Sequence, residues 1–326
     1  MNKISSDNVT AIGLYTGTKG KQGCTCNCLG CCLGAYGDHN SDYQGNESQL
    51  QEMIRLLPRL EKALIFGNPD ISIDTEFCNK VAYTLQQRGV IVAFNTSGVG
   101  GKKVLETLLN GLNYNMVRFI DFSLDTLDEC KLSLLKGINY SLETIIEGIE
   151  YCNSIGITAG VKPTIWTVNM NDDWEQYRQF LKRINVSRIK FHFGSLEGVN
   201  DKVAHVPESK ILEIKARFKD VGIIPQLLLT GEEFNAYSHG FKPRCFGTGP
   251  LSVFFEREGI KATFCTSYSA VHSGFTTELR DNNLAIIPRC DKKCPVSHNS
   301  LGFESDELHA VCRYYAFNPQ LNQFCI

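Results

Sequence analysis

The chain has 326 residues, a formal net charge of −2 and an apolar fraction of 43%. A chain of this length can bury a large core, so we expect one large α/β domain, alone or with a smaller one. The near-neutral charge excludes the basic footprint of a dedicated nucleic-acid-binding protein, and no apolar run is long enough to span a membrane. The N-terminus lacks the apolar segment of a signal peptide, which predicts a cytoplasmic protein without membrane or nucleic-acid partners.

Short apolar runs alternate with amphipathic stretches through the first two thirds of the chain. The runs are typical of buried strands, whereas apolar residues three or four positions apart predict helices. In chain order we expect a strand over 10–16, a helix over 49–62, a strand over 63–66, a helix over 74–89, a strand over 90–94, a helix over 102–112, a strand over 116–124, a helix over 141–155, a strand over 157–166, a helix over 172–184, a strand over 188–193, a helix over 208–221 and a strand over 223–229.

This alternation predicts parallel βα units that form a partial or full barrel, with the site at the C-terminal ends of the strands. The pattern changes near residues 235–244. Beyond them we expect a hairpin with strands over 253–255 and 260–264, and a short helix near 306–315. We therefore divide the chain into a barrel over 1–235 and a small cysteine-rich domain over 236–326.

The fourteen cysteines are clustered rather than spread along the chain. Disulfide frameworks belong to small secreted domains, so clustered cysteines in this chain indicate metal or redox chemistry. One cluster lies in the loop after the first predicted strand and one in the last third of the chain. The first consists of Cys24, Cys26, Cys28, Cys31 and Cys32, and the second of Cys245, Cys265, Cys290, Cys294, Cys312 and Cys325.

Cys24, Cys28 and Cys31 have the spacing C-x3-C-x2-C. Three thiolates on one loop can hold three irons of a 4Fe–4S cube and leave the fourth iron open to another ligand. Structural zinc prefers four protein ligands, which a lone triple does not supply. The loop follows the first predicted strand, so it lies at the end of the barrel that carries the site. Cys26 and Cys32 are then extra thiols without an assigned role.

With this triple after its first strand, the chain resembles the radical S-adenosylmethionine (SAM) superfamily. The resemblance implies a partial (βα)6-type barrel, a 4Fe–4S cluster on Cys24, Cys28 and Cys31, and SAM bound to the open iron. It also implies that the reduced cluster donates an electron that breaks a C–S bond of SAM, and that the resulting 5′-deoxyadenosyl radical abstracts a hydrogen atom. Gly30 departs from the family, which usually carries an aromatic residue before the third cysteine.

The resemblance also implies cofactor-binding residues at the strand ends. Gly67, Asn68 and Pro69 follow the second strand, where the family's GGEP-like motif meets the amine of SAM. Ser97 and Ser123 follow the third and fourth strands, near the expected carboxylate and ribose. Each stretch taken alone is also typical of a turn.

Lys162 and His192 are the catalytic candidates, on the fifth and sixth strands. Lys162 is placed to pair with the carboxylate of SAM or with an anionic substrate. The alternatives are a solvated strand end for Lys162 and a structural role for His192.

The second cysteine cluster is similar to the start of a twitch or SPASM auxiliary-cluster domain. Cys245 and Cys265 flank Gly259 as in that pattern, with one extra residue, and Cys290 and Cys294 complete a ligand set for one auxiliary 4Fe–4S cluster. Cys312 is the leading substitute ligand, and Cys325 is left over. Zinc ligation or free thiols are the alternatives.

The resemblance thus predicts a radical SAM oxidoreductase or maturase. Dehydrogenation, epimerisation or cross-linking of a small molecule or short peptide is expected, with flavodoxin or ferredoxin as electron donor. About ten residues precede the barrel, so a ribosomal-peptide maturase would need a separate leader-binding partner. Hypotheses of other classes are a zinc-stabilised nucleic-acid-binding protein, which the charge of −2 disfavours, and an iron–sulfur carrier without catalysis.

Overall fold

A sheet with a parallel centre organises the computed structural model, which describes residues 4–5, 9–16, 26, 28–29, 45–66, 70–193, 206–218, 228–230, 251–256, 259–263, 277–280, 283–286 and 308–310. The neighbouring strands of the centre all pair in parallel. In spatial order they are β11 (Leu251–Glu256), β2 (Ala11–Tyr15), β3 (Lys62–Ile65), β4 (Ile91–Thr96), β5 (Val117–Phe122), β6 (Ala159–Val161) and β8 (Arg188–Ile189).

Antiparallel strands extend the sheet beyond β11. They are β12 (Gly259–Thr263), β13 (Thr277–Arg280), β14 (Asn283–Ile286) and β1 (Ile4–Ser5). Two small ladders lie outside the main sheet. The parallel ladder joins β7 (Thr164–Ile165) to β9 (His192–Phe193), and the antiparallel one joins β10 (Leu228–Thr230) to β15 (Leu308–Ala310).

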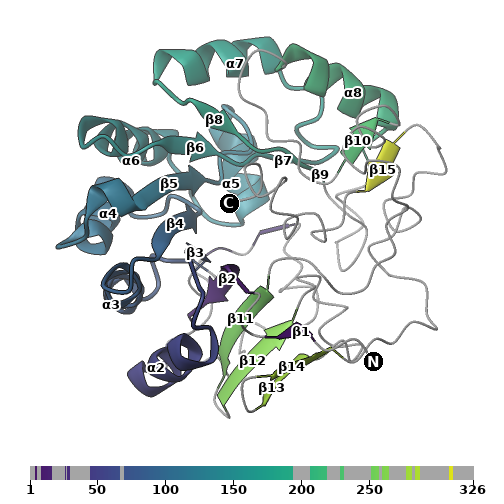
Figure 1. Cartoon of the computed structure of the whole chain (residues 1–326). Helices are drawn as coiled ribbons and strands as arrows, with labels where there is room; N and C mark the ends of the chain where they lie inside the picture. The colour runs from purple at the N-terminus through teal and green to yellow at the C-terminus, as the bar shows by residue number, and fades with distance from the viewer. Residues whose placement is uncertain are drawn as a thin grey trace.

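Helices connect the parallel strands and form an outer layer around them (Figure 1). This is the arrangement that parallel strands require, because each crossover must return to the same end of the sheet. The helices are α2 (Glu47–Leu56), α3 (Thr75–Gln86), α4 (Gly101–Leu109), α5 (Glu129–Lys136), α6 (Leu142–Ser154), α7 (Trp174–Arg183) and α8 (Glu208–Arg217), with a 3-10 helix at Tyr114–Met116.

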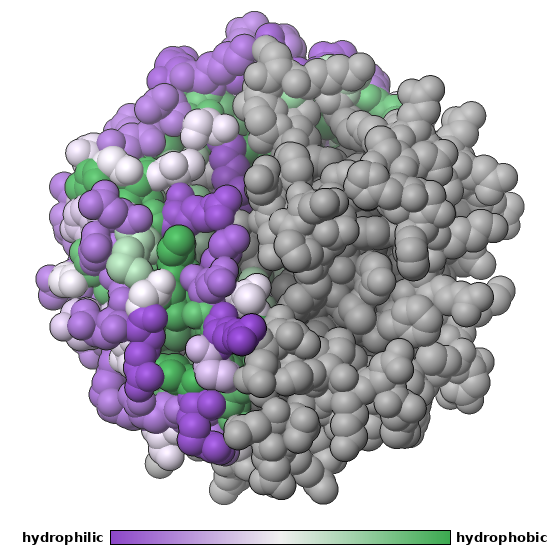
Figure 2. All heavy atoms as spheres, in the orientation of Figure 1, coloured by the Kyte–Doolittle hydropathy of each residue, from purple (hydrophilic) through white to green (hydrophobic). Residues whose placement is uncertain are grey.

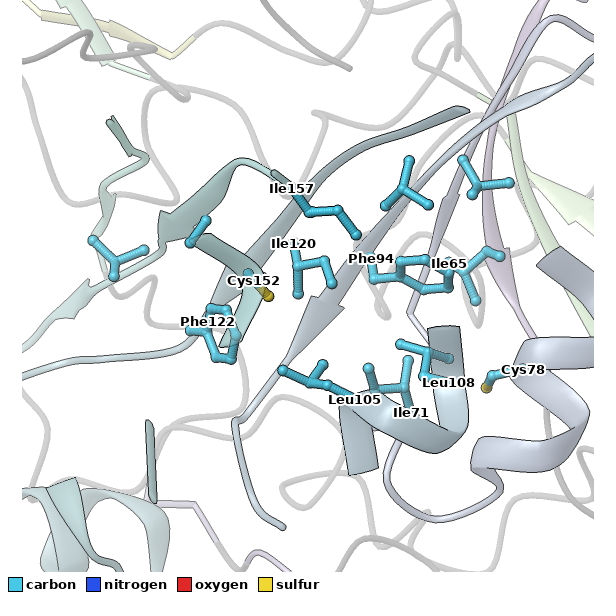
Figure 3. Packing of buried hydrophobic residues seen from close by; sticks show 14 of the residues in the cluster. Ile65, Ile71, Cys78, Phe94, Leu105, Leu108, Ile120, Phe122, Cys152 and Ile157 are labelled. Carbon is cyan, nitrogen blue, oxygen red and sulfur yellow. The ribbon is translucent and has the colours of Figure 1, made fainter. Parts of the chain in front are cut away.

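The alternating side chains of each strand divide between two apolar layers. Ile65, Phe94 and Ile120 point toward the helices and pack with Leu105 and Leu108 of α4 in the main core (Figure 3). The intervening residues of the same strands lie on the other face, inside the barrel. That inner layer consists of Leu64, Ala93 and Phe119, with Phe66 packed against it.

A buried ion pair crosses the inner face of the barrel. Asp121 accepts hydrogen bonds from Arg188 at 2.9 and 3.2 Å, and the guanidinium lies 3.7 Å from the centre of the Phe119 ring. Gly160 lies between the two partners in the sheet, and a Cβ there would clash with Oδ1 of Asp121. Glycine at this position therefore lets the ion pair form across β6.

The structure confirms an α/β fold with a partial (βα)6-type barrel. Asp74 caps α3 as expected, since its side chain accepts a hydrogen bond from the Phe77 amide. The expected helix over 49–62 is wrong at its end, because α2 ends at Leu56 and residues 62–65 form β3. Pro58 explains the early end, since it disfavours helical geometry at the preceding Leu57, whose φ is −121°.

Two expected strands are interrupted. The strand predicted over 157–166 divides into β6 and β7 at Pro163, which has no amide hydrogen for the ladder. The strand predicted over 188–193 divides at the same level into β8 and β9. Lys162 lies between β6, which pairs with β5 and β8, and β7, which pairs with β9. Its amide donates to the Phe122 carbonyl at 2.8 Å.

Two elements expected in the C-terminal third of the chain differ in the structure. Of the strand predicted over 223–229, the structure describes only the end: β10 pairs with β15 and does not extend the parallel sheet. The helix expected near 306–315 is wrong over Leu308–Ala310, where the structure has the strand β15. The backbone hydrogen bonds of these residues are made by pairing with β10 instead of within a helix. The expected hairpin is confirmed as β11 and β12, and β11 lies beside β2.

No helix within the described ranges is long and apolar enough to cross a membrane. On the face shown in Figure 2, hydrophilic side chains cover most of the coloured surface and apolar ones are scattered between them.

Candidate functional site

The loops that follow the parallel strands carry the predicted site residues. Because the carboxyl ends of parallel strands meet at one edge, residues after β2, β4, β5 and β6 are brought together there. Cys26 and Cys28 follow β2, Ser97 follows β4, Ser123 follows β5 and Lys162 follows β6.

Cys28 is partly buried, and its thiol shares a hydrogen bond with the buried thiol of Cys26. That hydrogen bond and burial raise the pKa of Cys28, whereas the neighbouring ammonium of Lys136 acts in the opposite direction. The backbone next to Cys28 is tied to helix α5, since the Leu29 amide donates to the Leu135 carbonyl at 3.0 Å. The cysteine loop is thus held against α5.

Lys136 and Asp125 form a buried ion pair beside this loop. The Nζ of Lys136 lies 2.7 Å from Oδ2 of Asp125, and only 7% and 6% of the two side chains are exposed. Burial alone would lower the pKa of Lys136, but the charge of Asp125 and the thiols of Cys28 and Cys26 raise it above its ordinary value. Lys136 therefore keeps its positive charge inside the protein.

A fully buried asparagine fixes the backbone around Asp125. The Nδ2 of Asn169 donates to the carbonyl oxygens of Asp125 at 2.7 Å and Thr164 at 3.0 Å, and its Oδ1 accepts from the Trp166 amide at 2.7 Å. Oδ1 of Asp125 also accepts from the Thr164 amide at 2.7 Å. The ends of β5 and β7 are thereby held in one rigid network.

A second network joins the loops after β3 and β4. The buried carboxylate of Asp70 accepts hydrogen bonds from the Ser97 amide and from the Thr96 hydroxyl. The Tyr140 hydroxyl donates to the Ser97 carbonyl. Burial, followed by the nearby charge of Asp70, raises the pKa of Tyr140, so this phenol remains a hydrogen-bond donor at neutral pH. Ser97 is therefore held through its backbone, at the edge where the sequence placed a cofactor contact.

The other described candidates lie at the same edge. The Ser123 amide donates to the Thr96 carbonyl at 2.8 Å, and its side chain is partly exposed. Lys162 is partly buried, with its Nζ 5.8 Å from the centre of the Phe66 ring. His192 belongs to β9, where its backbone lies opposite Thr164.

The remaining predicted site residues lie outside the described residues. They are Cys24, Cys31, Gly67, Asn68, Pro69, Cys245, Cys265, Cys290 and Cys294, together with Cys312 and Cys325. The part of the chain that is described contains no group of three metal-ligating side chains. The proposed cysteine sets each include residues beyond it, so their assignments remain predictions.

The residues present fit an iron–sulfur cluster. Thiolates of cysteine are the ligands that such clusters require, and a nearby positive charge favours the thiolate form. Cys28 has a second thiol, Cys26, within hydrogen-bonding reach and the buried ammonium of Lys136 beside it. We therefore regard the loop end with Cys28 as suited to an anionic, thiolate-bound centre.

Sequence reasoning missed Lys136 and Asn169, and it noted Asp125 only as part of the polar stretch after the fourth strand. Helix α5 was not expected, because it buries few apolar residues and lacks a clear amphipathic stripe. Its ends did carry a signal: Asp128 is a good N-cap, and Gly137 follows the last residue with a left-handed φ of 65°. Lys136 at such an end suggests a solvated helix terminus, and only the tertiary packing shows its burial.

Comparison with known proteins gives a consistent result. The family model of the radical SAM superfamily matches residues 20–181. SuiB of Streptococcus suis, solved with its precursor peptide SuiA, is 12% identical with a TM-score of 0.60, and the match covers 81% of this chain and 61% of SuiB. This chain thus accounts for less than two thirds of the length of SuiB.

A second structure matches over almost its whole length. Native anSMEcpe with bound AdoMet and the Cp18Cys peptide is 13% identical with a TM-score of 0.60, and the match covers 96% of this chain and 98% of that one. At these identities the likeness shows a shared fold. None of the curated proteins matches the sequence.

Proposed function

Because the chain belongs to the radical SAM superfamily, we propose that this enzyme cleaves SAM reductively and abstracts a hydrogen atom from a peptide or small-molecule substrate. The observation that carries the proposal is the cysteine loop itself. Cys28 lies at the C-terminal edge of the parallel strands, tied to α5 and next to a buried positive charge. A peptide substrate is favoured by the relatives SuiB and anSMEcpe, whose structures contain peptides.

In this proposal Cys24, Cys28 and Cys31 hold the 4Fe–4S cluster. When bound, the cluster and SAM supply an electron and a 5′-deoxyadenosyl radical. The chain's own residues would bind and orient SAM. Ser97 and Ser123 supply polar groups after β4 and β5, and Gly67, Asn68 and Pro69, which follow β3 in the sequence, are proposed to supply backbone carbonyls and an amide.

The substrate side of the proposed site lies along the inner face of β6 and β3. Lys162, above the Phe66 ring, is the group that would hold an anionic part of SAM or substrate. His192 is proposed as a neighbouring polar group, because its strand pairs with β7 just after Lys162.

The C-terminal cysteines extend the proposal to one auxiliary 4Fe–4S cluster on Cys245, Cys265, Cys290 and Cys294. Support comes from the confirmed hairpin of β11 and β12, in which Ser252, seven residues after Cys245, lies opposite Thr263, two residues before Cys265. A flavodoxin or ferredoxin in the cytoplasm is the proposed electron donor, and a separate leader-binding protein is the proposed partner if the substrate is a ribosomal peptide.

Anaerobic reconstitution of the full chain with iron and sulfide tests the function. We expect a brown protein with about eight irons per chain that forms 5′-deoxyadenosine from SAM under dithionite. Cys28→Ala should abolish this cleavage, whereas Cys130→Ala, an exposed thiol on α5, should retain it. A colourless protein with stoichiometric zinc would refute the proposal and favour the zinc-stabilised alternative.

The auxiliary cluster is tested separately. Cys265→Ala should lower the iron content to about four per chain while SAM cleavage persists. Unchanged iron content would remove Cys265 from the ligand set.

A further inference from the structure

A buried cation, the ammonium group of Lys136, lies next to the cysteine loop. Lys136 is the last residue of α5, and its side chain is 7% exposed. An ammonium at this depth needs a partner, and Asp125 provides it at 2.7 Å. Such a pair is close to neutral at long range, but at short range the nearer charge dominates.

Of the two charges, Lys136 lies on the helix that the cysteine loop contacts directly. The amide of Leu29, next to Cys28, donates to the carbonyl of Leu135, next to Lys136, at 3.0 Å, and Leu29 packs against Leu135 and Trp166. The cysteine loop therefore approaches α5 on its lysine end.

The position of both charges is fixed by the surrounding backbone. Asp125 accepts from the Thr164 amide at 2.7 Å, and Asn169 holds the carbonyl groups of Asp125 and Thr164. Charges held in a buried, preorganised network do not rearrange when a nearby group changes its own charge, so they favour one charge state over the other.

We propose that Lys136 is a positioning residue that raises the reduction potential of the cluster held by Cys28, and that Asp125 partly offsets this effect. The inference rests on the proposed function, because it requires a cluster on the cysteine loop. Reduction adds one electron from the external donor, with no bond made or broken. The fixed positive charge of Lys136 stabilises the more negative, reduced form, and Asp125 opposes it.

A redox titration of the reconstituted full chain, followed by electron paramagnetic resonance without SAM, measures this effect. Omitting SAM removes any contribution of Lys136 to SAM binding. In Lys136→Met, at a fixed solution potential, the ratio of reduced to oxidised cluster should fall about tenfold, equal to ~59 mV for one electron. Asp125→Asn should move the ratio in the opposite direction. A Cys265→Ala background leaves only the signal of the cluster on the cysteine loop.

Lys131→Met is the matched control. Lys131 lies on the same helix and also pairs with an aspartate, Asp172, but its side chain is 36% exposed and it lies near the start of α5, away from the end that the cysteine loop contacts. Its removal should leave the ratio unchanged. Lys136→Arg keeps the charge and should remain close to the unmodified protein.

The outcomes separate the two proposals. Normal cluster content with the same potential in Lys136→Met and Asp125→Asn would overturn the role of Lys136 and leave the function standing. If Lys136→Met does not retain a cluster, the direction of the Asp125→Asn shift decides: a higher potential supports the inference, and no change or a lower one overturns it. Failure of the unmodified chain to bind a cluster would refute the function itself.

Discussion

Individual cysteines of this chain differ by their surroundings. Cys78 and Cys152 lie in the main core among aliphatic side chains (Figure 3), and burial raises the pKa of each thiol to about 12. The hydrogen bond to Cys26 and burial raise the pKa of Cys28 as well, but Cys28 lies at the loop end beside Lys136, whose charge acts in the opposite direction. The first two are therefore structural thiols, and Cys28 has the electropositive neighbour that a metal ligand needs.

The buried thiols predict a loss of stability at alkaline pH. Burial raises the pKa of the Cys152 thiol from an ordinary 9.0 to about 12 in the folded protein. Between these values the thiol ionises in the unfolded chain but stays protonated in the folded one, so the free energy of unfolding falls as the pH rises above 9. Between pH 8 and pH 10, the free energy of unfolding of Cys152→Ala should fall by about 1 kcal/mol less than that of the unmodified chain. Urea unfolding under reducing conditions measures this.

Ile149→Ala serves as the control, because Ile149 is buried in the same core but does not titrate. It should lower stability equally at both pH values. An identical pH dependence in Cys152→Ala and the unmodified chain would contradict the prediction.

At the scale of elements, capping residues define where the helices begin and end. α2 begins with a capping box, in which Asn46 and Gln49 exchange side-chain and backbone hydrogen bonds at 3.0 and 3.1 Å. α5 begins at the Asp128 cap and ends where Gly137 adopts a left-handed φ of 65°. The helix thus ends directly after Lys136, whose side chain is buried and paired with Asp125.

Gly137→Ala should lower the free energy of unfolding by about 1 kcal/mol, because a Cβ is strained in the left-handed region. Gly137→Asn is the matched control, since asparagine tolerates this conformation better and should cost less. Urea unfolding of the two variants measures the order. Equal effects of alanine and asparagine would show that the backbone conformation at Gly137 is not the cause.

For the whole molecule, the main consequence of the sheet order is that a strand from the C-terminal third of the chain extends the parallel part of the sheet. β11 pairs with β2, so residues 251–256 lie beside residues 11–15. Phe254, Tyr15 and Phe66 form a stack of rings with centroids 4.5 and 4.7 Å apart, and Phe255 is fully buried on the opposite face. This strand therefore shares the core of the barrel, although it follows the boundary expected near residue 235.

Phe255→Ala should destabilise the barrel as a whole, by about 3–5 kcal/mol. The two tryptophans, Trp166 and Trp174, lie on the side of β7 and α7, so their fluorescence reports on unfolding far from β11. The fluorescence transition should move to lower urea, with a smaller shift for Phe255→Leu. An unchanged tryptophan transition would show that the hairpin unfolds as a separate unit.

Much of the element order was predictable, and the reasons are local. Periodic apolar residues predicted the alternating strands and helices up to α8, and Asp74 was recognised as a cap. The errors have local causes too: Pro58 ended α2 early, Pro163 interrupted a strand, and α5 has too weak an apolar stripe to be recognised. Of the candidate site, the strand-end placement of Ser97, Ser123 and Lys162 was predictable.

The sequence by itself determined the βα order and the spacing of Cys24, Cys28 and Cys31, because periodicity and loop spacing are properties of neighbouring residues. Only the tertiary structure decided that β11 lies beside β2 and that Lys136, paired with Asp125, is buried next to Cys28. Both depend on contacts between segments far apart in the chain, where burial and strand pairing override local preference, and no local pattern records which distant partner a residue will meet.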